Sequence, residues 1–110
     1  MNTLNFYPYY ERFLRSRTKT TTFRTRAPAF RPGDIVQLTL GWSEEDVRKL
    51  HKAEILSVYS KTISSLESED FEGESPDCKT PETTALVLSA IYRKQIEQGD
   101  SIWIVKFRHL

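Results

Sequence analysis

The apolar segment SIWIVKF, residues 101–107, is the clearest β-strand in the sequence and constrains the fold more than any other stretch. Strand character also occurs at residues 4–6, 20–23, 35–40 and 53–60, from alternating apolar positions or from runs of β-branched side chains. Polar turns separate these segments. Strands interrupted by few helices favour an α+β fold.

Apolar side chains at i, i+3 and i+4 predict an amphipathic helix over residues 9–17. A second helix is expected to begin at Thr80, which is a suitable N-cap followed by proline, and to run to Tyr92 or beyond. Ser64 or Ser65 is expected to cap a short acidic helix. We therefore expect two to three helices in addition to the strands.

Turn and loop signals fill the remaining stretches. Arg-Pro-Gly-Asp at residues 31–34 predicts a type II turn, because proline fixes φ at the second position and glycine permits the positive φ of the third. Residues 42–52 are charged and indicate a loop with at most one helical turn near residues 44–50. Glycine and two prolines predict an ordered loop over residues 70–81.

The length of 110 residues fits a single domain, 1–110, with one hydrophobic core. The order of elements is strand, helix, three strands, one or two helices, and a last strand. We therefore expect an α+β domain built as a small mixed β-barrel of about five to six strands, flanked by two to three helices.

Composition excludes several classes of site. No apolar run approaches the length of a membrane span, and the N-terminal stretch lacks the pattern of a secretory signal, so we expect a cytoplasmic protein. The single cysteine, Cys78, has no thiol partner for a disulfide or a zinc site. The two histidines, His51 and His109, lack metal-ligand spacing. We therefore predict no metal and no cofactor.

Charge is distributed unevenly along the chain. Residues 1–34 carry seven basic and two acidic side chains: Arg12, Arg15, Arg17, Lys19, Arg24, Arg26 and Arg31 against Glu11 and Asp34. Residues 66–82 are acidic: Glu67, Glu69, Asp70, Glu72, Glu74, Asp77 and Glu82 against Lys79. One interpretation is two solvated faces that pair with each other. The other is a phosphate-binding surface beside an acidic loop that places one carboxylate in a site.

The order and spacing of several segments resemble an ASCH domain, a PUA-like family. The segments are LNFYPYYERFLRSRTKTTTFR, FRPGDIVQL, KAEILSVYSKTISSLESEDFEGE, a helix that ends in AIY, and IWIVKFRHL. Individual features of the resemblance are Lys19 and Arg24 around the second strand, the turn at residues 33–34, an acidic segment that begins at Leu66, and the closing residues 107–110. The resemblance covers nearly the whole chain and implies a PUA-like barrel.

The small bacterial members of this family, which this chain resembles in the pattern Lys-Thr-x-Thr-x-Arg, include amidohydrolases that remove the acetyl group from the exocyclic amine of acetylcytidine. Here that pattern begins at Lys19. The resemblance implies a catalytic lysine, threonine and glutamate at Lys19, Thr22 and Glu74, with Glu72 as the alternative glutamate. The predicted substrate-binding residues are Arg24, Arg17 and Tyr92.

Two departures distinguish this chain from the pattern. Many members have glycine two residues before the lysine, where this chain has Arg17, a cation that either narrows the entrance or binds a phosphate. The acidic loop is also longer, by residues 75–79.

Amide hydrolysis needs a nucleophile, a base, an acid for the leaving amine and donors for the oxyanion. A lysine acts as the base only when its pKa falls from about 10.4 toward about 7–8. Side chains alternate on a regular strand, so Thr22 and Arg24 share a face while Lys19 and Thr22 do not. Lys19 reaches Thr22 only from a position off the regular strand.

Two further functions compete with hydrolysis of acetylcytidine. A non-catalytic RNA-binding module accords with the basic N-terminal third, and it would take RNA rather than a modified cytidine nucleoside as its partner. RNA cleavage is the third, and the absence of a histidine near the motif disfavours it.

Overall fold

The computed structural model describes residues 2–43 and 45–110. Its five strands are β1 (Thr3–Phe6), β2 (Thr21–Arg24), β3 (Ile35–Leu40), β4 (Arg48–Thr62) and β5 (Ser101–His109). Its α-helices are α1 (Glu11–Arg15), α2 (Ser68–Phe71) and α3 (Pro81–Tyr92), and its 3-10 helices are η1 (Pro8–Tyr10) and η2 (Ile63–Ser65). None of the helices formed by the described residues is both long and apolar enough to cross a membrane.

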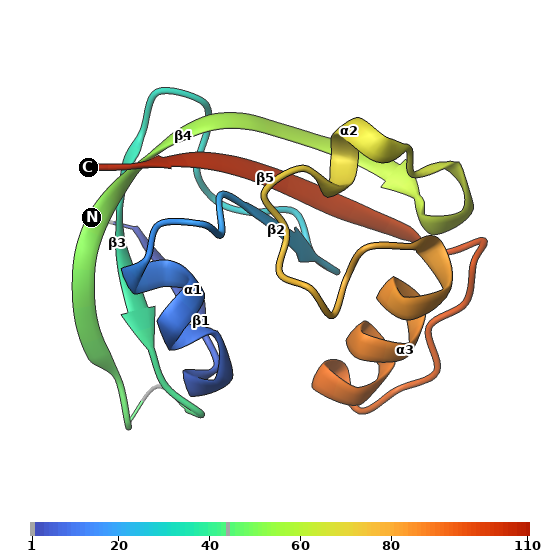
Figure 1. Ribbon diagram of the computed structural model, residues 1–110, viewed down its shortest axis with the longest axis horizontal. Coiled ribbons are helices and arrows are strands. Elements are labelled where there is room, and N and C mark those ends of the chain that lie inside the picture. The colour runs from blue at the N-terminus through green and yellow to red at the C-terminus, as the bar shows by residue number, and fades with distance from the viewer. Residues whose placement is uncertain (1, 44) are drawn as a thin grey trace.

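The strands form one mixed sheet in the order β1-β3-β4-β5-β2. Only β1 and β3 run parallel, and the other three pairs are antiparallel. The sheet curls into a half-barrel, and Figure 1 shows β4 and β5 bending over α1 at one end and over α3 at the other. This confirms the α+β class and the small mixed barrel with flanking helices.

Because the sheet is curled, its two edge strands, β1 and β2, approach each other. Within the described residues no ladder of backbone hydrogen bonds joins them. A side chain links them instead, because Arg24 on β2 donates from Nη2 to the carbonyl of Asn5 on β1 at 2.8 Å. The guanidinium also lies over the Phe6 ring, 4.9 Å from its centroid. Arg24 therefore helps to hold the two edges of the half-barrel together.

Two clusters of buried apolar side chains fill the interior. The first lies under β1, β3 and α1 and includes Phe6, Tyr10 and Phe107. The second lies under α2 and α3 and includes Phe23 and Leu88. The core is thus divided along the length of the sheet, and a cavity at the boundary has walls from both clusters.

Most predicted elements are confirmed, with two corrections. The loop predicted for residues 42–52 is wrong in its second half, because β4 already begins at Arg48. Of the helical turn suggested near residues 44–50, residue 44 lies outside the described residues and Arg48–Leu50 are extended. Neither Ser64 nor Ser65 caps the short acidic helix, since both lie in η2; the cap is Glu67, which forms a capping box with Asp70.

The C-terminal end of α1 turns the chain sharply toward β2. Arg17 has a φ of 65°, in the left-handed region. Its amide donates to the carbonyl of Leu14, and the amide of Thr18 donates to the carbonyl of Phe13. This pair of hydrogen bonds is the Schellman motif, whose left-handed position is most often glycine. A side chain at this left-handed position is strained.

We expect Arg17→Gly to raise the free energy of unfolding by about 0.5–1 kcal/mol, because glycine adopts positive φ without a clash at Cβ. Urea unfolding measures the change. The matched control is Arg12→Gly in the first turn of α1, which should lower stability by about 0.5–1 kcal/mol. An Arg17→Gly protein that is less stable than wild type would contradict the assignment of strain.

Candidate functional site

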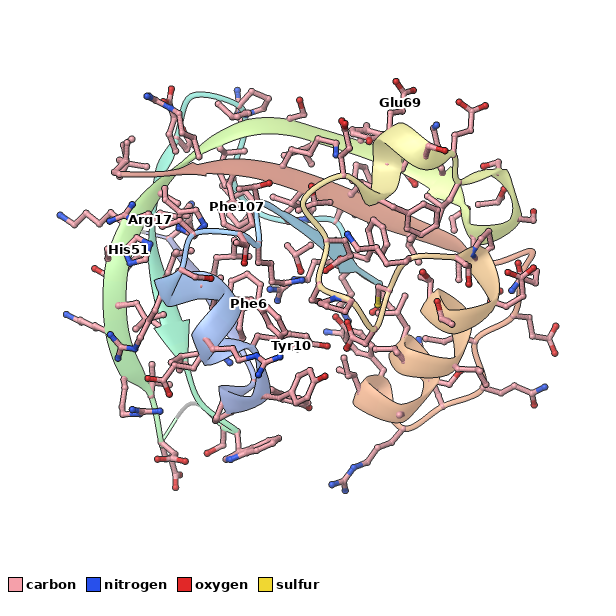
Figure 2. The ribbon with its side chains drawn as sticks, in the orientation of Figure 1. Phe6, Tyr10, Arg17, His51, Glu69 and Phe107 are labelled. Atoms are coloured by element: carbon pink, nitrogen blue, oxygen red, sulfur yellow. The ribbon has the colours of Figure 1, made fainter. Side chains whose placement is uncertain are left out.

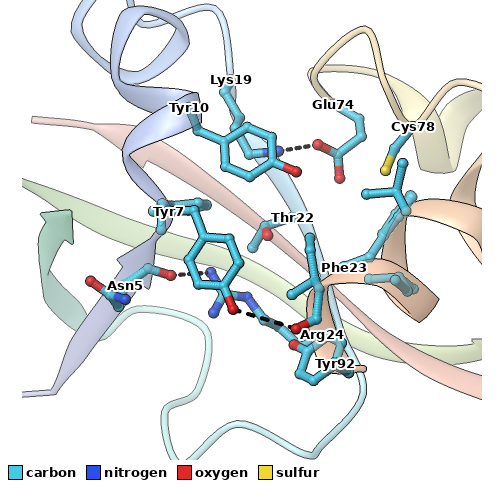
Figure 3. Close-up of a pocket in the computed structure, with 14 residues that line it drawn as sticks. Asn5, Tyr7, Tyr10, Lys19, Thr22, Phe23, Arg24, Glu74, Cys78 and Tyr92 are labelled. Atoms are coloured by element: carbon cyan, nitrogen blue, oxygen red, sulfur yellow. Dashed lines mark hydrogen bonds and ion pairs between the residues drawn. The ribbon is translucent and has the colours of Figure 1, made fainter. Parts of the chain in front are cut away.

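A cavity of about 220 Å³ lies between the two core clusters. Its walls come from β1 and η1, from Lys19 and β2, from the loop between α2 and α3, and from α3 itself. Figure 3 shows Lys19, Thr22 and Glu74 around this space, with Tyr7 and Arg24 on the other side. The predicted residues Lys19, Thr22, Glu74, Arg24 and Tyr92 all line it.

A buried ion pair forms the inner end of the cavity. Lys19 and Glu74 are 3% and 6% exposed, and Lys19 Nζ donates to Glu74 Oε1. Lys19 Nζ also donates to Ser75 Oγ at 3.1 Å, and the Ser75 amide donates to the same carboxylate oxygen at 2.7 Å. Each charged group thus has a hydrogen-bonding partner in addition to the other, which offsets part of the cost of burying them.

Aromatic and acidic side chains hold the pair in place. Lys19 Nζ lies 4.9 Å from the centroid of the Tyr10 ring, a cation–π contact. The Tyr10 hydroxyl donates to Asp77 Oδ2 at 2.8 Å, and Ser75 Oγ bonds to Asp77 Oδ1 at 2.8 Å. Burial and the bond to Asp77 raise the pKa of Tyr10, so its phenol stays neutral. Asp77 thereby anchors Tyr10 and Ser75, two of the residues that contact the Lys19 ammonium group.

Lys19 and Thr22 line the same cavity because the backbone between them is not a regular strand. The amides of Thr20 and Thr21 both donate to the Gly73 carbonyl, at 2.8 and 3.1 Å. Consecutive amides of a regular strand point in opposite directions, so a shared acceptor marks a local kink. β2 begins only at Thr21, and Lys19 lies off the strand as the geometric argument from the sequence requires.

Thr22 and Arg24, two residues apart on β2, both line the cavity, as does Phe23 between them. The Thr22 side chain is buried, and its hydroxyl has no hydrogen-bonding partner among the described residues. The hydroxyl remains accessible from the cavity. The neighbouring Thr21 hydroxyl, in contrast, donates to the carbonyl of Glu72. The Thr22 hydroxyl is therefore available to a molecule in the cavity.

Two predicted residues lie elsewhere. Arg17 and Glu72 line a separate groove on the other side of β2, and Glu72 is exposed. The left-handed turn directs Arg17 to the end of the chain, where its Nη1 donates to the Leu110 carbonyl at 3.1 Å. Figure 2 shows Arg17 beside His51, far from Tyr10 at the cavity. Of the two candidate glutamates, only Glu74 reaches the cavity.

Protein-family models and curated proteins give no match to this sequence. Solved structures, in contrast, match the fold of this chain. Protein EF3133 from Enterococcus faecalis V583, described by the family model DUF984, has a TM-score of 0.68 at 13% identity, over 93% of this chain and 70% of its own. An ASCH domain from Lactobacillus crispatus JV V101 has a TM-score of 0.62 at 10% identity, over 90% of this chain and 68% of its own. This chain has the ASCH-domain fold. Hypothetical protein PH0355 has a TM-score of 0.65 at 16% identity, over 96% of this chain and 95% of its own.

The ASCH fold also brings together two histidines that the sequence analysis set aside. His51 Nε2 and His109 Nδ1 are 2.6 Å apart, because β4 and β5 are antiparallel neighbours. His109 Nε2 donates to the backbone carbonyl of Lys19 at 2.8 Å, so in a neutral pair His51 must donate to His109. Their separation of 58 positions in the sequence hid this contact.

Sequence reasoning also missed Ser75, Tyr10 and Cys78 as parts of the site. Cys78 is buried at the cavity wall, and burial raises the pKa of its thiol, so it stays protonated and a poor nucleophile. Among residues 2–43 and 45–110, no group of three or more His, Cys, Asp or Glu side chains is arranged to hold a metal ion.

Gly73 supports the site within the ASCH fold, because it has φ 79 and an added Cβ would overlap the Thr20 hydroxyl. We expect Gly73→Ala to lower the free energy of unfolding by about 1–3 kcal/mol and to displace the loop that carries Glu74. The control is Gly99→Ala, where nothing lies near an added Cβ; its change should stay within about 0.5 kcal/mol. Equal effects of the two substitutions, measured by urea unfolding, would contradict the prediction.

The histidine pair should make stability depend on pH. Burial first, and then the positive charges of the other histidine, Arg17 and Arg15, lower the pKa of His51; burial and Arg17 lower the pKa of His109. The unfolded chain then binds more protons than the folded one below pH 6.5, the ordinary value for histidine, so stability falls as pH falls through this window.

We expect the free energy of unfolding to fall between about pH 7.5 and about pH 5.5, and to fall less in His51→Gln, which removes one titrating ring and its repulsion of the other. Urea unfolding at several pH values measures both curves. Parallel curves for the two proteins would show that the histidines do not contribute.

Proposed function

We propose that this chain is an amidohydrolase that removes the acetyl group from the exocyclic amine of acetylcytidine, giving cytidine and acetate. The observation that carries the proposal is one cavity lined by a buried lysine–glutamate pair, an arginine and a threonine hydroxyl with no hydrogen-bonding partner among the described residues. The sequence around the lysine and the threonine resembles the pattern of ASCH amidohydrolases. The structural similarity to a solved ASCH domain supports the fold of this chain but not its activity.

The cavity has the dimensions of a single ring with a small substituent. Its volume of about 220 Å³ is below the range of roughly 300–1,000 Å³ that is typical for drug-sized ligands. Phe6, Tyr7 and Phe23 give it apolar walls, suited to the faces of a base. These walls favour a substrate that inserts its base and leaves its sugar outside.

The reaction uses Lys19, Glu74 and Thr22. Transfer of a proton from Lys19 to Glu74 along their hydrogen bond gives a neutral amine beside a carboxylic acid. Thr22 Oγ1 then attacks the acetyl carbon, and its proton passes to the Lys19 amine. The Lys19 ammonium group that results stabilises the oxyanion, and Arg24 is left to bind the substrate.

The intermediate collapses as the bond between the acetyl carbon and the exocyclic nitrogen breaks. The nitrogen takes the proton of the Glu74 carboxylic acid and leaves as cytidine, which restores the Lys19–Glu74 ion pair and leaves an acetyl ester on Thr22. Water then attacks this ester by the same sequence of transfers, and the products are acetate and the free threonine. No metal or cofactor enters either step.

Thr22→Val tests the proposal, because it keeps the shape of the side chain and removes a buried hydroxyl for which the described residues provide no hydrogen-bonding partner. We expect wild type to hydrolyse acetylcytidine and Thr22→Val to lose at least about 10³-fold in kcat while it remains folded. The ultraviolet absorbance of acetylcytidine measures turnover.

Thr21→Val is the matched control on the opposite face of β2. It removes the bond to the Glu72 carbonyl and the bond that the hydroxyl accepts from Lys106 Nζ, so stability should fall by about 1–2 kcal/mol while turnover persists. Folded wild-type protein that leaves acetylcytidine intact over hours would sink the proposal. RNA binding that weakens steeply with salt would then favour a non-catalytic RNA-binding module.

A further inference from the structure

A second hollow of about 290 Å³ adjoins the cavity that holds Thr22. It lies between the start of β1, including Asn2 and Thr3, and the segment after β2 at residues 25–30. We call it the outer hollow, and the cavity described above the inner cavity. Both spaces are lined by Arg24 and Tyr92, so they meet at these two side chains, which Figure 3 shows next to each other.

The two spaces differ in charge. Glu74 and Lys19 both line the inner cavity, so its charges balance. The outer hollow is lined by Arg24 and Arg26, and no Asp or Glu of the described residues lines it. Neither arginine takes part in an ion pair within residues 2–43 and 45–110. The outer hollow is therefore a cationic space without an anion of its own.

Arg24 is the more informative of the two arginines because it is partly buried. One of its nitrogens donates to Asn5, and the others have no acceptor among the described residues. A guanidinium that is removed from water without a carboxylate or phosphate partner carries an uncompensated desolvation cost, and burial accordingly lowers the pKa of Arg24. An anion that arrives with the substrate would offset this cost.

The relative position of the spaces indicates where that anion sits on the substrate. A base in the inner cavity places its sugar at Arg24 and Tyr92, where the two spaces meet. Asn2 and Thr3 offer polar groups for sugar hydroxyls, and Arg26, which also lines the hollow, is exposed. The arginine fork is the side chain best suited to grip a phosphate.

We propose that the substrate is a nucleotide, acetylcytidine monophosphate, whose sugar and phosphate occupy the outer hollow and whose phosphate pairs with Arg24 and Arg26. This deepens the proposed function and rests on it. The phosphate remains on the sugar throughout the reaction and contributes binding only. The outer hollow has room for about one sugar–phosphate unit, so the substrate is a free nucleotide rather than a strand of RNA.

The test compares kcat/KM for acetylcytidine, its 5′- and 3′-monophosphates, and a trinucleotide with acetylcytidine at its centre. We expect one monophosphate to exceed the nucleoside by at least about tenfold, with an advantage that shrinks as salt is raised. Arg26→Ala should bring the ratio of monophosphate to nucleoside close to one, while Arg31→Ala, another exposed arginine outside the hollow, should keep it.

The outcomes separate this inference from the proposed function. If the nucleoside and both monophosphates are hydrolysed with equal kcat/KM, the proposed phosphate site is wrong and the proposed amidohydrolase activity stands. A trinucleotide that is hydrolysed better than either monophosphate overturns the restriction to a free nucleotide. If nothing is hydrolysed by folded protein, the proposed function fails.

Binding gives a readout that does not depend on turnover. Isothermal titration with cytidine and with its 5′- and 3′-monophosphates should show one monophosphate binding at least about tenfold more tightly, and Arg26→Ala should abolish the difference. Equal affinity for cytidine and both monophosphates would overturn the phosphate site even in an inactive protein.

Discussion

The buried ion pair between Lys19 and Glu74 is the interaction on which the rest of the site depends. Two charged side chains that are 3% and 6% exposed have lost most of their contact with water. Their mutual attraction offsets that loss only when further hydrogen bonds satisfy both groups, and such a pair is often no more stable than apolar residues of the same size. Here the further partners are Ser75 and the Tyr10 ring. The cost of this pair is most readily explained if it serves chemistry.

Holding the pair imposes constraints on two distant parts of the chain. The loop with Glu74 must lie against the start of β2, and Gly73 allows this because its carbonyl accepts both the Thr20 and the Thr21 amide. The same contact kinks the backbone before β2, so that Lys19 turns to the side of Thr22. The acidic loop is thus neither a fully solvated face nor a simple partner of the basic N-terminal third: one carboxylate, Glu74, is drawn into the cavity.

Local patterns in the sequence were sufficient for much of the fold. The β3 strand, the capped start of α3 and the strand β5 follow from alternation, an N-cap with proline, and an apolar run. The first part of β4 was missed because Arg48, Lys49 and Lys52 read as loop, whereas pairing with β3 makes them a strand with exposed side chains. The site residues came from a resemblance, and Arg17 lies apart because the turn after α1 directs it away. Contacts such as His109 with Lys19 span 90 positions, so no local pattern announces them.

The most direct test of the account is the stability of the double variant Lys19→Met with Glu74→Gln, compared by urea unfolding with wild type and with Lys19→Met alone. If the pair is retained for chemistry, the double variant is as stable as wild type or more so, whereas the single variant loses about 3–5 kcal/mol because a buried carboxylate is left without its partner. A double variant that loses as much stability as the single one would contradict the account, and would make the pair a structural element of the fold.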